Sequence, residues 1–405
     1  MRAHGFMYAA FSIREQGAVG VSHCAGYNAA ARSRQFMFAE RTNWNLAPNR
    51  LSQALAAHRA AGKPLLDLTI SNPTECGFSY DGPGILEALS NPAALAYEPN
   101  PKGLESARRA VAAYYAARED DVSSEDIFLT TSTSEAYSYV FRTLCNPGDE
   151  FLIPSPSYPL FYDHGWQTDF HSLEQAVTPR TRGVIVVHPN NPTGHFTKRA
   201  EMSKLNAICS GRKMAIIADE VFLDFSLEEN RPESFAANQR VLTFTLSGLS
   251  KISGLPQMKA AWVVVSGPQE WKREALARLE VIADTYLSMN APVQLAIPRF
   301  LEQRRAFQKQ LMSRVRRSLA ELDRQLAAQK ACTRLTVEGG WYAVLRVPAT
   351  RSDEDLAIEL LTTKGVYVHP GHFYDFPSDG YLVLSLITAE ADFSRGFVDV
   401  LVHFK

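Results

Sequence analysis

The sequence has almost no excess of either charge. Its 405 residues include 42 Lys and Arg against 43 Asp and Glu, which gives a formal net charge of −1. Without a basic surplus there is little to hold a phosphate backbone, so nucleic acid is not an expected partner. Apolar runs are short as well, and none approaches the roughly 18 residues that span a bilayer. These absences predict a cytoplasmic protein without a membrane partner.

Cysteine is scarce and unpatterned. The five cysteines form no CxxC pair and no metal-type spacing: Cys24, Cys76, Cys145, Cys209 and Cys332. A disulfide framework and a zinc site are therefore excluded as expectations, and we expect reduced, mostly buried thiols. We expect no metal.

The first 37 residues differ from the rest. They are rich in Ala, Gly and Ser and carry four arginines but one acid, Glu15. Their apolar part is short and is interrupted by Arg14 and Glu15, unlike that of a targeting peptide. We expect residues 1–37 to be a flexible N-terminal extension, or the product of a start codon upstream of Met37.

From Leu46 onward, apolar strand-like runs alternate with helical stretches. Many runs are apolar at consecutive positions, which is typical of strands covered on both faces. We expect an α/β fold: a large domain with a mostly parallel sheet between helices, and a smaller mixed α/β domain built from both chain ends. The expected domain bounds are 38–95 and 296–405 for the small domain and 96–295 for the large one. The expected strands of the large domain are 127–130, 150–153, 184–187, 215–218, 241–245 and 260–265.

Four loops at the carboxyl ends of these strands have unusual content, and ligands bind at that edge of such sheets. Ser132 and Glu135 have the spacing of a capping box, so a helix N-terminus able to bind an anion is expected there, although the loop taken alone favours a plain helix cap. Residues 188–194 place paired asparagines between two prolines, which favours a rigid loop. Asp219 and Glu220 follow a buried strand and suit a cationic ligand group.

The fourth loop contains Lys251. It lies among small residues between two apolar strands, 241–245 and 260–265. Most lysines are solvated, but an amine held away from water has a lowered pKa and becomes nucleophilic, as Schiff-base chemistry requires.

Six motifs in order resemble those of the fold-type I pyridoxal-phosphate enzymes, specifically the class I/II aminotransferase family. The resemblance runs from about Ala47 to the C-terminus. Its specificity lies in the order and spacing of the motifs, which are residues 97–103, 132–135, 156–159, 191–194, 219–222 and 250–251.

The resemblance implies an enzyme that moves an amino group from an amino acid to a 2-oxo acid by a ping-pong mechanism, with pyridoxal 5′-phosphate as cofactor. Lys251 would form the Schiff base with the cofactor and then move the substrate proton. Asp219 would pair with the pyridine nitrogen.

The resemblance also assigns binding roles. Asn191 would donate to the 3′ oxygen of the cofactor ring and Tyr158 would stack on its face. Tyr97 would reach the phosphate across the interface of a homodimer with shared active sites. The other expected phosphate ligands are Ser132, Thr133, Ser134, Ser250 and Lys259.

Several positions depart from the family pattern. Lys259 stands where relatives place an arginine, which keeps the charge but loses the fork geometry. Gly248 replaces a phosphate-binding serine, for which Ser250 would compensate. Phe222 replaces a tyrosine that donates to the ring oxygen, so Asn191 would be the main donor.

The largest departure is Val383, where relatives carry the arginine that grips the substrate carboxylate. Either another cation binds the carboxylate, or the substrate is not a standard α-amino acid. The candidates for substrate binding are His372, as first choice, and Ser71, with Arg346, His369 and Lys102 as further cations.

Three other functions remain open at this stage. Val383 is compatible with a lyase, decarboxylase or cyclase on the same scaffold. A non-catalytic, cofactor-sensing domain is weakened by the absence of a DNA-binding motif. A cofactor-free lysine aldolase would also use Lys251.

Overall fold

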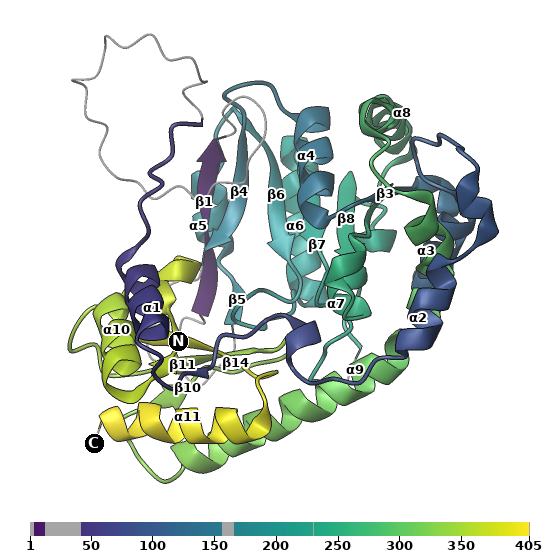
Figure 1. The fold of residues 1–405 in the computed structure, drawn as a ribbon. Coiled ribbons are helices and arrows are strands. Elements are labelled where there is room, and N and C mark those ends of the chain that lie inside the picture. Colours follow the sequence, from purple (N-terminus) through teal and green to yellow (C-terminus); the bar gives the residue numbers. More distant parts are fainter. Residues whose placement is uncertain (1–3, 13–41, 156–165, 230, 405) are drawn as a thin grey trace, which may run out of the picture.

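The computed structural model describes residues 4–12, 42–155, 166–229 and 231–404. The centre of the fold is an eight-stranded sheet (Figure 1). Four neighbouring strands, β8, β7, β6 and β4, run parallel, and β9 is antiparallel to both β8 and β3. In order across the sheet the strands are β3 (Ile127–Thr130), β9 (Ala261–Ser266), β8 (Thr243–Gly248), β7 (Ala215–Asp219), β6 (Thr181–Val187), β4 (Glu150–Ser155), β1 (His4–Ser12) and β5 (Trp166–Thr168).

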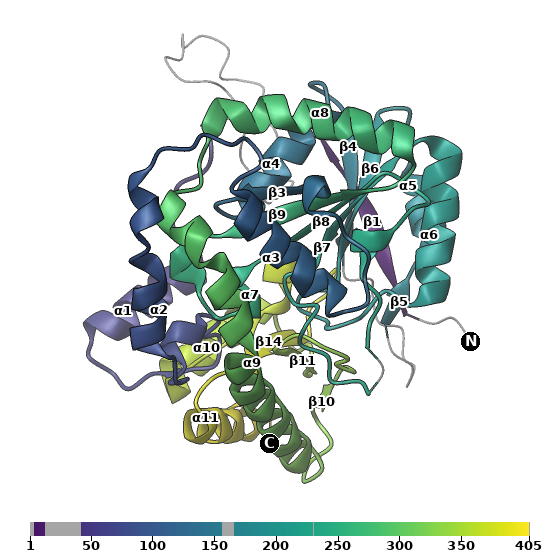
Figure 2. The same cartoon turned by 90° about the vertical axis from the view of Figure 1, so that its right-hand side faces the viewer.

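Helices cover both faces of this sheet (Figures 1 and 2). In β7, Ala215 and Ile217 pack into one apolar cluster while Ile216 and Ala218 pack into another on the opposite face. Burial on both faces is why the strands are apolar at consecutive positions. The first face carries α4 (Thr133–Leu144) and α8 (Gln269–Tyr286), and the second carries α5 (Phe170–Ala176), α6 (Arg199–Arg212) and α3 (Glu105–Ala116).

A smaller unit lies below the sheet in Figure 1 and joins residues from both ends of the chain. Its four-stranded sheet has the order β10 (Thr333–Arg334), β11 (Tyr342–Arg346), β14 (Tyr381–Ser385) and β13 (His369–Pro370). A separate pair joins β2 (Leu66–Asp67) to β12 (Val366–Tyr367). Its helices are α1 (Arg50–Ala60), α10 (Asp353–Lys364) and α11 (Glu390–His403), and α2 (Gly82–Leu89) packs on α9.

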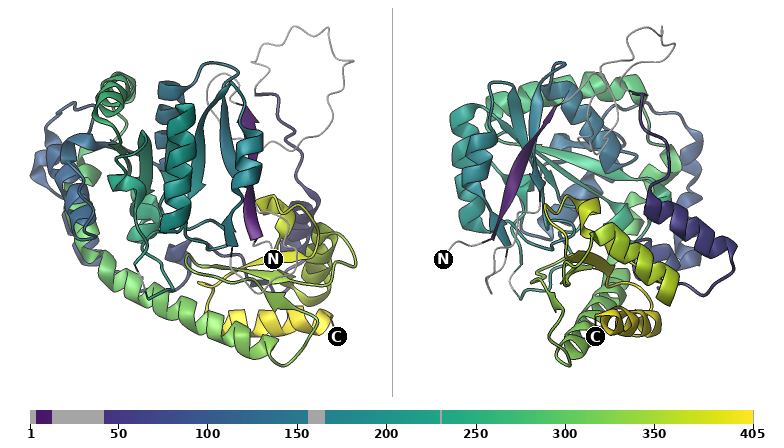
Figure 3. Two further views of the ribbon diagram at one scale, coloured as in Figure 1. Left: turned by 180° about the vertical axis from the view of Figure 1, so that it is seen from behind. Right: turned by 90° about the vertical axis from the view of Figure 1, so that its left-hand side faces the viewer.

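One long helix, α9 (Ala291–Leu326), connects the two units (Figure 3). At about 1.5 Å per residue its 36 residues extend over about 54 Å. Its first half packs with α3 and β9 through Ile297 and Phe300, and its second half packs into the small unit through Leu311 and Val315. The helix therefore holds the two units in a common frame.

The α/β fold class predicted from the sequence is confirmed, with a mostly parallel sheet between helices and a smaller mixed unit. The expected flexible extension does not describe residues 4–12, because they form β1 and pair with β4 from Met7 to Ser12. β1 also pairs with β5 and lies inside the sheet, and the composition of the whole 1–37 segment did not reveal this short strand.

Within the described ranges no helix is long and apolar enough to cross a membrane. A cytoplasmic location stays a prediction.

Candidate active site

The carboxyl ends of β3, β6, β7 and β8 meet at one edge of the large sheet, because these four strands run in the same direction. The next residues along the chain from these ends are the four loops singled out in the sequence. The backbone N–H of His188 donates to the carbonyl oxygen of Asp219 at 2.8 Å, which joins the loop after β6 to the end of β7. The topology thus brings the polar loops to one place.

Lys251 lies in α7 (Leu249–Ile252), one turn of helix directly after β8. Its Nζ lies 4.9 Å from the ring centroid of Trp341 and 5.5 Å from that of Phe222. Both rings are buried, and they form an apolar surface next to the amine that leaves little room for water. Burial lowers the pKa of Lys251, and the charge of Asp219 partly opposes that shift.

Asp219 is the last residue of β7 and keeps only part of its surface open to solvent. Its Oδ1 accepts from the backbone N–H of Val221 at 3.2 Å, and its Oδ2 accepts from the hydroxyl of Tyr137 at 3.2 Å. Burial raises the pKa of Asp219 to about 6, while these two donors and Lys251 act against the rise. A carboxylate with this raised pKa lacks one strong cationic partner.

Ser132 caps α4, and its Oγ accepts from the backbone N–H of Glu135 at 3.1 Å. The expected helix N-terminus is therefore present. Glu135 differs from a standard capping box, because its carboxylate accepts from the backbone N–H and hydroxyl of Thr131, at 2.7 and 3.0 Å. Thr133 and Ser134 form the first turn, whose backbone N–H groups have no acceptor inside a helix and can bind an anion.

Asn191 is exposed in a loop whose backbone is held from within. Asn190 accepts from the backbone N–H of Gly194 at 2.7 Å through its carbonyl and from the hydroxyl of Thr193 at 3.0 Å through its side chain. The peptide bonds before Pro189 and Pro192 are both cis. Hydrogen bonds within the loop thus support its backbone, and Asn191 is exposed on it.

Two other expected phosphate ligands lie close to Lys251 in the chain. Ser250 is in the same turn of helix and is partly exposed. Lys259 is exposed and follows a short 3₁₀ turn with a left-handed backbone, φ +51°. Gly248 has a packing reason: a Cβ there would lie 2.9 Å from the carbonyl oxygen of Ala260, so no serine fits without a shift.

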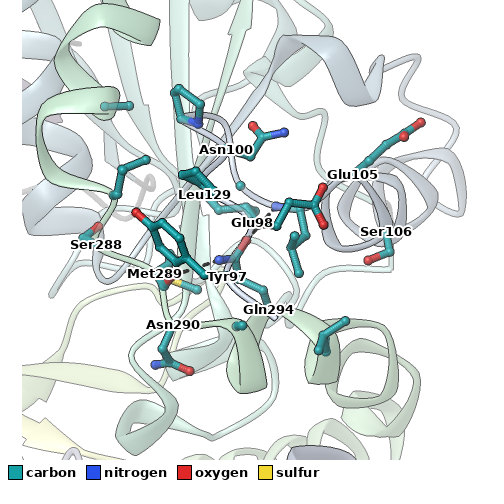
Figure 4. A pocket seen from close by; sticks show the side chains of 18 of the residues that line it. Tyr97, Glu98, Asn100, Glu105, Ser106, Leu129, Ser288, Met289, Asn290 and Gln294 are labelled. Atoms are coloured by element: carbon teal, nitrogen blue, oxygen red, sulfur yellow. Dashed lines mark hydrogen bonds between the residues drawn. The ribbon is translucent and has the colours of Figure 1, made fainter. Parts of the chain in front are cut away.

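Tyr97 is 82% exposed and lies away from Lys251 on the outer surface. It lines a separate cavity of about 540 Å³ between residues 93–106 and the segment before α9 (Figure 4). Tyr158 lies outside the described residues.

The position of the family arginine is occupied by an apolar cluster. Val383 is 1% exposed in β14, between Val344 of β11 and His369 of β13. Phe376 and Tyr381 pack against it. Burial lowers the pKa of His369, and its Nδ1 lies 3.0 Å from the hydroxyl of Tyr374.

Of the substrate candidates, Ser71 lies beside the hydroxyl of Tyr342, where burial raises the pKa of that phenol and the contact with Ser71 lowers it. His372 is in a 3₁₀ turn after β13, with its ring edge-on to Phe373 at 4.8 Å. The amine of Lys102 has a hydrogen-bond partner in the protein, because its Nζ donates to the carbonyl oxygen of Glu125 at 3.0 Å. Binding of the substrate carboxylate by Lys102 stays a prediction, because this bond uses one of the three N–H donors of the amine.

The expectation that both acids after β7 serve a cationic ligand is wrong for the second. Glu220 is 1% exposed and points into the protein, where it accepts from the hydroxyl of Ser234 at 2.7 Å and the backbone N–H of Phe235 at 2.6 Å. Burial raises the pKa of Glu220 to about 8. Adjacent residues of a strand face opposite sides, so the two carboxylates cannot share one ligand.

Sequence reasoning missed Tyr137 and Trp341. Tyr137 is one turn into α4 from the Ser132 cap, a position that would have been found by following the helix face inward. Trp341 comes from the small unit, 90 residues after Lys251, and no local pattern connects them.

A two-domain α/β fold with a buried lysine and a buried carboxylate at one sheet edge defines the class of fold-type I pyridoxal-phosphate enzymes, as the resemblance implied. The family model for class I and II aminotransferases matches residues 85–391, well over half of the chain. The chain belongs to this family.

Known proteins similar to this chain in sequence or in fold are also aminotransferases. Glutamate-pyruvate aminotransferase AlaA of Escherichia coli is 32% identical over 256 residues, covering 58% of this chain and 63% of that protein's length. Alanine aminotransferase of Mycobacterium tuberculosis is 27% identical over 365 residues, covering 82% of this chain and 83% of that one. The structure of an alanine aminotransferase from Pyrococcus furiosus has a TM-score of 0.76 at 20% identity, covering 87% and 97% of the two chains, which shows the shared fold.

Proposed function

We propose that this protein is a pyridoxal-phosphate-dependent aminotransferase that moves an amino group from an amino acid to a 2-oxo acid in two half-reactions. One observation carries the proposal. The amine of Lys251 is held in an aromatic, water-poor place beside the carboxylate of Asp219, and burial shifts the pKa of each toward its neutral form. No structural role of a lysine requires such a position.

The residues present fit the cofactor. Asp219 is held by two donors and still has a raised pKa, so a ring N–H⁺ would supply the missing partner. The N-terminus of α4, with the hydroxyls of Thr133 and Ser134, suits a phosphate. Bound there, pyridoxal phosphate would supply an aldehyde for amines and an electron-poor ring that makes a substrate Cα–H acidic.

Lys251 would do two tasks with one amine. Because burial lowers its pKa, a larger share of the side chain is neutral near pH 7 than for an exposed lysine, and only the neutral amine is a nucleophile. Once displaced by the amino group of a donor, the same nitrogen can accept a proton from the substrate Cα and return it. The rings of Trp341 and Phe222 keep water from this nitrogen.

Asp219 would hold the proton on the ring nitrogen. The backbone N–H of Val221 and the hydroxyl of Tyr137 fix the direction of the carboxylate, so that little reorganisation is needed. Asn191 would donate to the ring oxygen, with Tyr158 stacked on the ring face. Ser132, Ser250 and Lys259 would complete the phosphate contacts.

The substrate side departs from the family. The Val383 cluster offers no charge to a carboxylate. We propose that Ser71 and His372 contact the substrate, with His369 behind them. The similarity to a glutamate-pyruvate aminotransferase makes glutamate and pyruvate the first donor and acceptor to test.

The first prediction is spectral. Adding the correct amino donor to the protein loaded with pyridoxal phosphate should change the visible absorbance of the bound cofactor, and adding a 2-oxo acid should restore it. A panel of amino acids, followed by chromatography of the products, measures both half-reactions.

Protein without cofactor is the control, and it should show no change. If no donor alters the spectrum, the aminotransferase proposal is contradicted. Release of carbon dioxide or an elimination product without a new amino acid would support a decarboxylase or lyase instead.

We further propose a homodimer with shared active sites. Tyr97 is 82% exposed and borders the cavity that Figure 4 shows, and Leu95, two residues before it, is 92% exposed. The side chain of Gln294 holds its wall, accepting from the backbone N–H of Leu104 at 2.6 Å and donating to the carbonyl oxygen of Met289 at 2.9 Å. Large apolar side chains grouped on a surface mark an interface, which supports contact with a second copy.

The second prediction tests this interface. Leu95→Glu places a charge in it twice per dimer, and we expect dimer affinity to fall about a hundredfold or more. Sedimentation velocity over a range of concentrations measures the change. Val398→Glu, on a 45% exposed residue of α11, is the matched control and should stay dimeric. An intact Leu95→Glu dimer would remove this surface from consideration.

A further inference from the structure

His195 is a buried residue between two carboxylates. It is 3% exposed, and its Nε2 lies 3.1 Å from Oε2 of Glu201 while its Nδ1 lies 3.3 Å from Oε2 of Glu338. Glu201 begins α6, and Glu338 lies between β10 and β11 of the small unit. The imidazole therefore spans the seam between the two units.

The number of protons on His195 follows from its neighbours. A neutral imidazole has one N–H and can donate to one carboxylate, whereas the imidazolium donates to both. Glu201 also accepts from the backbone N–H groups of Lys198 at 2.8 Å and Thr168 at 2.5 Å, and Glu338 accepts from the backbone N–H of Phe196 at 2.9 Å. Both acids are thereby held ionised.

The pKa directions agree with this count. Burial would lower the pKa of His195, but the two carboxylates raise it above its ordinary value. Burial would raise the pKa of Glu201, but His195 and the backbone donors lower it to about 2. Glu338 is likewise lowered.

The other titratable groups near His195 are Lys198, which has acidic partners, and His188, which is neutral. Lys198 contacts Glu228 and Glu338, each at 3.0 Å, and its pKa is raised by these acids against the effect of burial. Burial and the charge of His195 lower the pKa of His188 to about 3, so that ring is neutral, and its Nδ1 accepts from the backbone N–H of Thr197 at 3.1 Å. Among these groups, His195 is the one whose raised pKa starts from an ordinary value near neutral pH.

His195 and its two carboxylates connect two parts of the candidate active site. His195 comes four residues after Asn191, and Glu338 comes three residues before Trp341, whose ring lies beneath Lys251. The two segments are in close contact, since a Cβ at Gly194, where φ is +75°, would lie 2.5 Å from the carbonyl oxygen of Gly339. A change at His195 therefore acts on both walls of the site.

We propose that doubly protonated His195 is a positioning residue, which clamps the Asn191 loop to the segment carrying Trp341 and releases it when the imidazole loses a proton. The effect on the cofactor depends on the proposed function, while the clamp itself does not. Its contribution to stability is full below the ordinary pKa of about 6.5 and is lost as pH rises through the raised pKa of the folded state.

Glu338→Gln removes the negative charge beside His195 but keeps a side chain that can form a hydrogen bond with its ring. The amide of a glutamine can donate to an unprotonated Nδ1, so the neutral imidazole then satisfies both neighbours. His195→Gln removes the titrating group. His171→Gln is the matched control, because His171 is exposed on α5 and its contact is with Gln175 of the same helix.

Three measurements use the full chain. Carbon-labelled histidine NMR of the cofactor-free protein, assigned with His195→Gln, gives the pKa of His195. Thermal unfolding across pH 6–10 gives its stability effect. Titration with pyridoxal phosphate across the same range gives the cofactor Kd.

We expect a His195 pKa above the ordinary value that falls in Glu338→Gln, together with loss of part of the alkaline rise in cofactor Kd. For His195→Gln we expect cofactor binding about tenfold weaker at pH 7, the size of one charged hydrogen bond. His171→Gln should match the unaltered protein.

A His195 pKa at or below the ordinary value, or one unchanged by Glu338→Gln, overturns the clamp. Lower thermal stability of His195→Gln with unchanged cofactor Kd at every pH overturns the positioning role and leaves a structural one. If the unaltered protein binds no pyridoxal phosphate, the proposed function fails, and the NMR titration still decides the clamp.

Discussion

Replacing Lys251 with alanine should lower the rate of amino transfer by about 10⁴-fold or more, because one amine serves as both nucleophile and base. The fold should persist. A buried amine whose pKa is lowered costs free energy at neutral pH, so its removal leaves the free energy of unfolding unchanged or slightly higher. Steady-state kinetics and urea unfolding measure the two effects on the same preparation.

Lys63→Ala is the control for Lys251, since Lys63 is an exposed lysine outside the site. Borohydride reduction of the loaded protein followed by peptide mass mapping should locate the cofactor on Lys251 in the unaltered chain and on no residue of Lys251→Ala. A label on a different lysine, or a Lys251→Ala protein with unchanged turnover, would remove the basis of the proposed function.

Replacing Asp219 with a neutral residue should lower the activity of the enzyme and raise the stability of the cofactor-free protein. Asp219→Asn keeps one oxygen that can accept from Val221, and its amide N–H can donate to the hydroxyl of Tyr137, but it loses the charge that would hold the ring proton. Removing one partner of a buried charge pair costs about 3–5 kcal/mol, so we expect turnover to fall about a hundredfold to a thousandfold. Kinetics at saturating cofactor measure this loss.

The cofactor-free protein should respond in the opposite direction. The folded pKa of Asp219 is about 6 against 3.8 ordinarily, so the folded state binds the proton more tightly than the unfolded state. Stability therefore falls as pH rises from about 4 to 6, and above that the charged carboxylate costs about 3 kcal/mol. Asp219→Asn should be more stable than the unaltered protein at pH 7, and the difference should vanish near pH 4.

Asp224→Asn is the matched control, because Asp224 is buried with its partner present. Its Oδ1 accepts from Arg118 at 2.7 Å and Tyr114 at 3.0 Å, and its Oδ2 accepts from Gln308 at 2.8 Å. Neutralising it should destabilise the protein at pH 7. If Asp219→Asn destabilises the cofactor-free protein as Asp224→Asn does, Asp219 already has its full set of partners and lacks no cationic one.

Most of the large sheet could be predicted from local pattern. The expected strand 215–218 is β7 within one residue, and the expected strand 260–265 is β9 within one residue. Consecutive apolar residues bounded by polar loops are an unambiguous signal when both faces of a strand are covered. β1, which lies inside the sheet between β4 and β5, was missed because the prediction rested on the composition of residues 1–37 as a whole.

Errors arose where a side chain had two directions to choose between. Glu220 and Asp219 are adjacent acids, and the alternation of the strand sends one into the core and one into the site. Lys102 precedes a glycine in a family motif, and its amine donates to the carbonyl oxygen of Glu125. Residue type and spacing do not encode such directions.

The linear order of motifs by itself determined the fold class, the lysine and the carboxylate, because those depend on strand periodicity and on residues that directly follow strands. Only the tertiary structure decided what surrounds them. Trp341 beneath Lys251, Tyr137 on Asp219 and the span of His195 from Glu201 to Glu338 join segments far apart in the chain. Burial and charge pairing set the pKa of each group, and both are properties of neighbours in space.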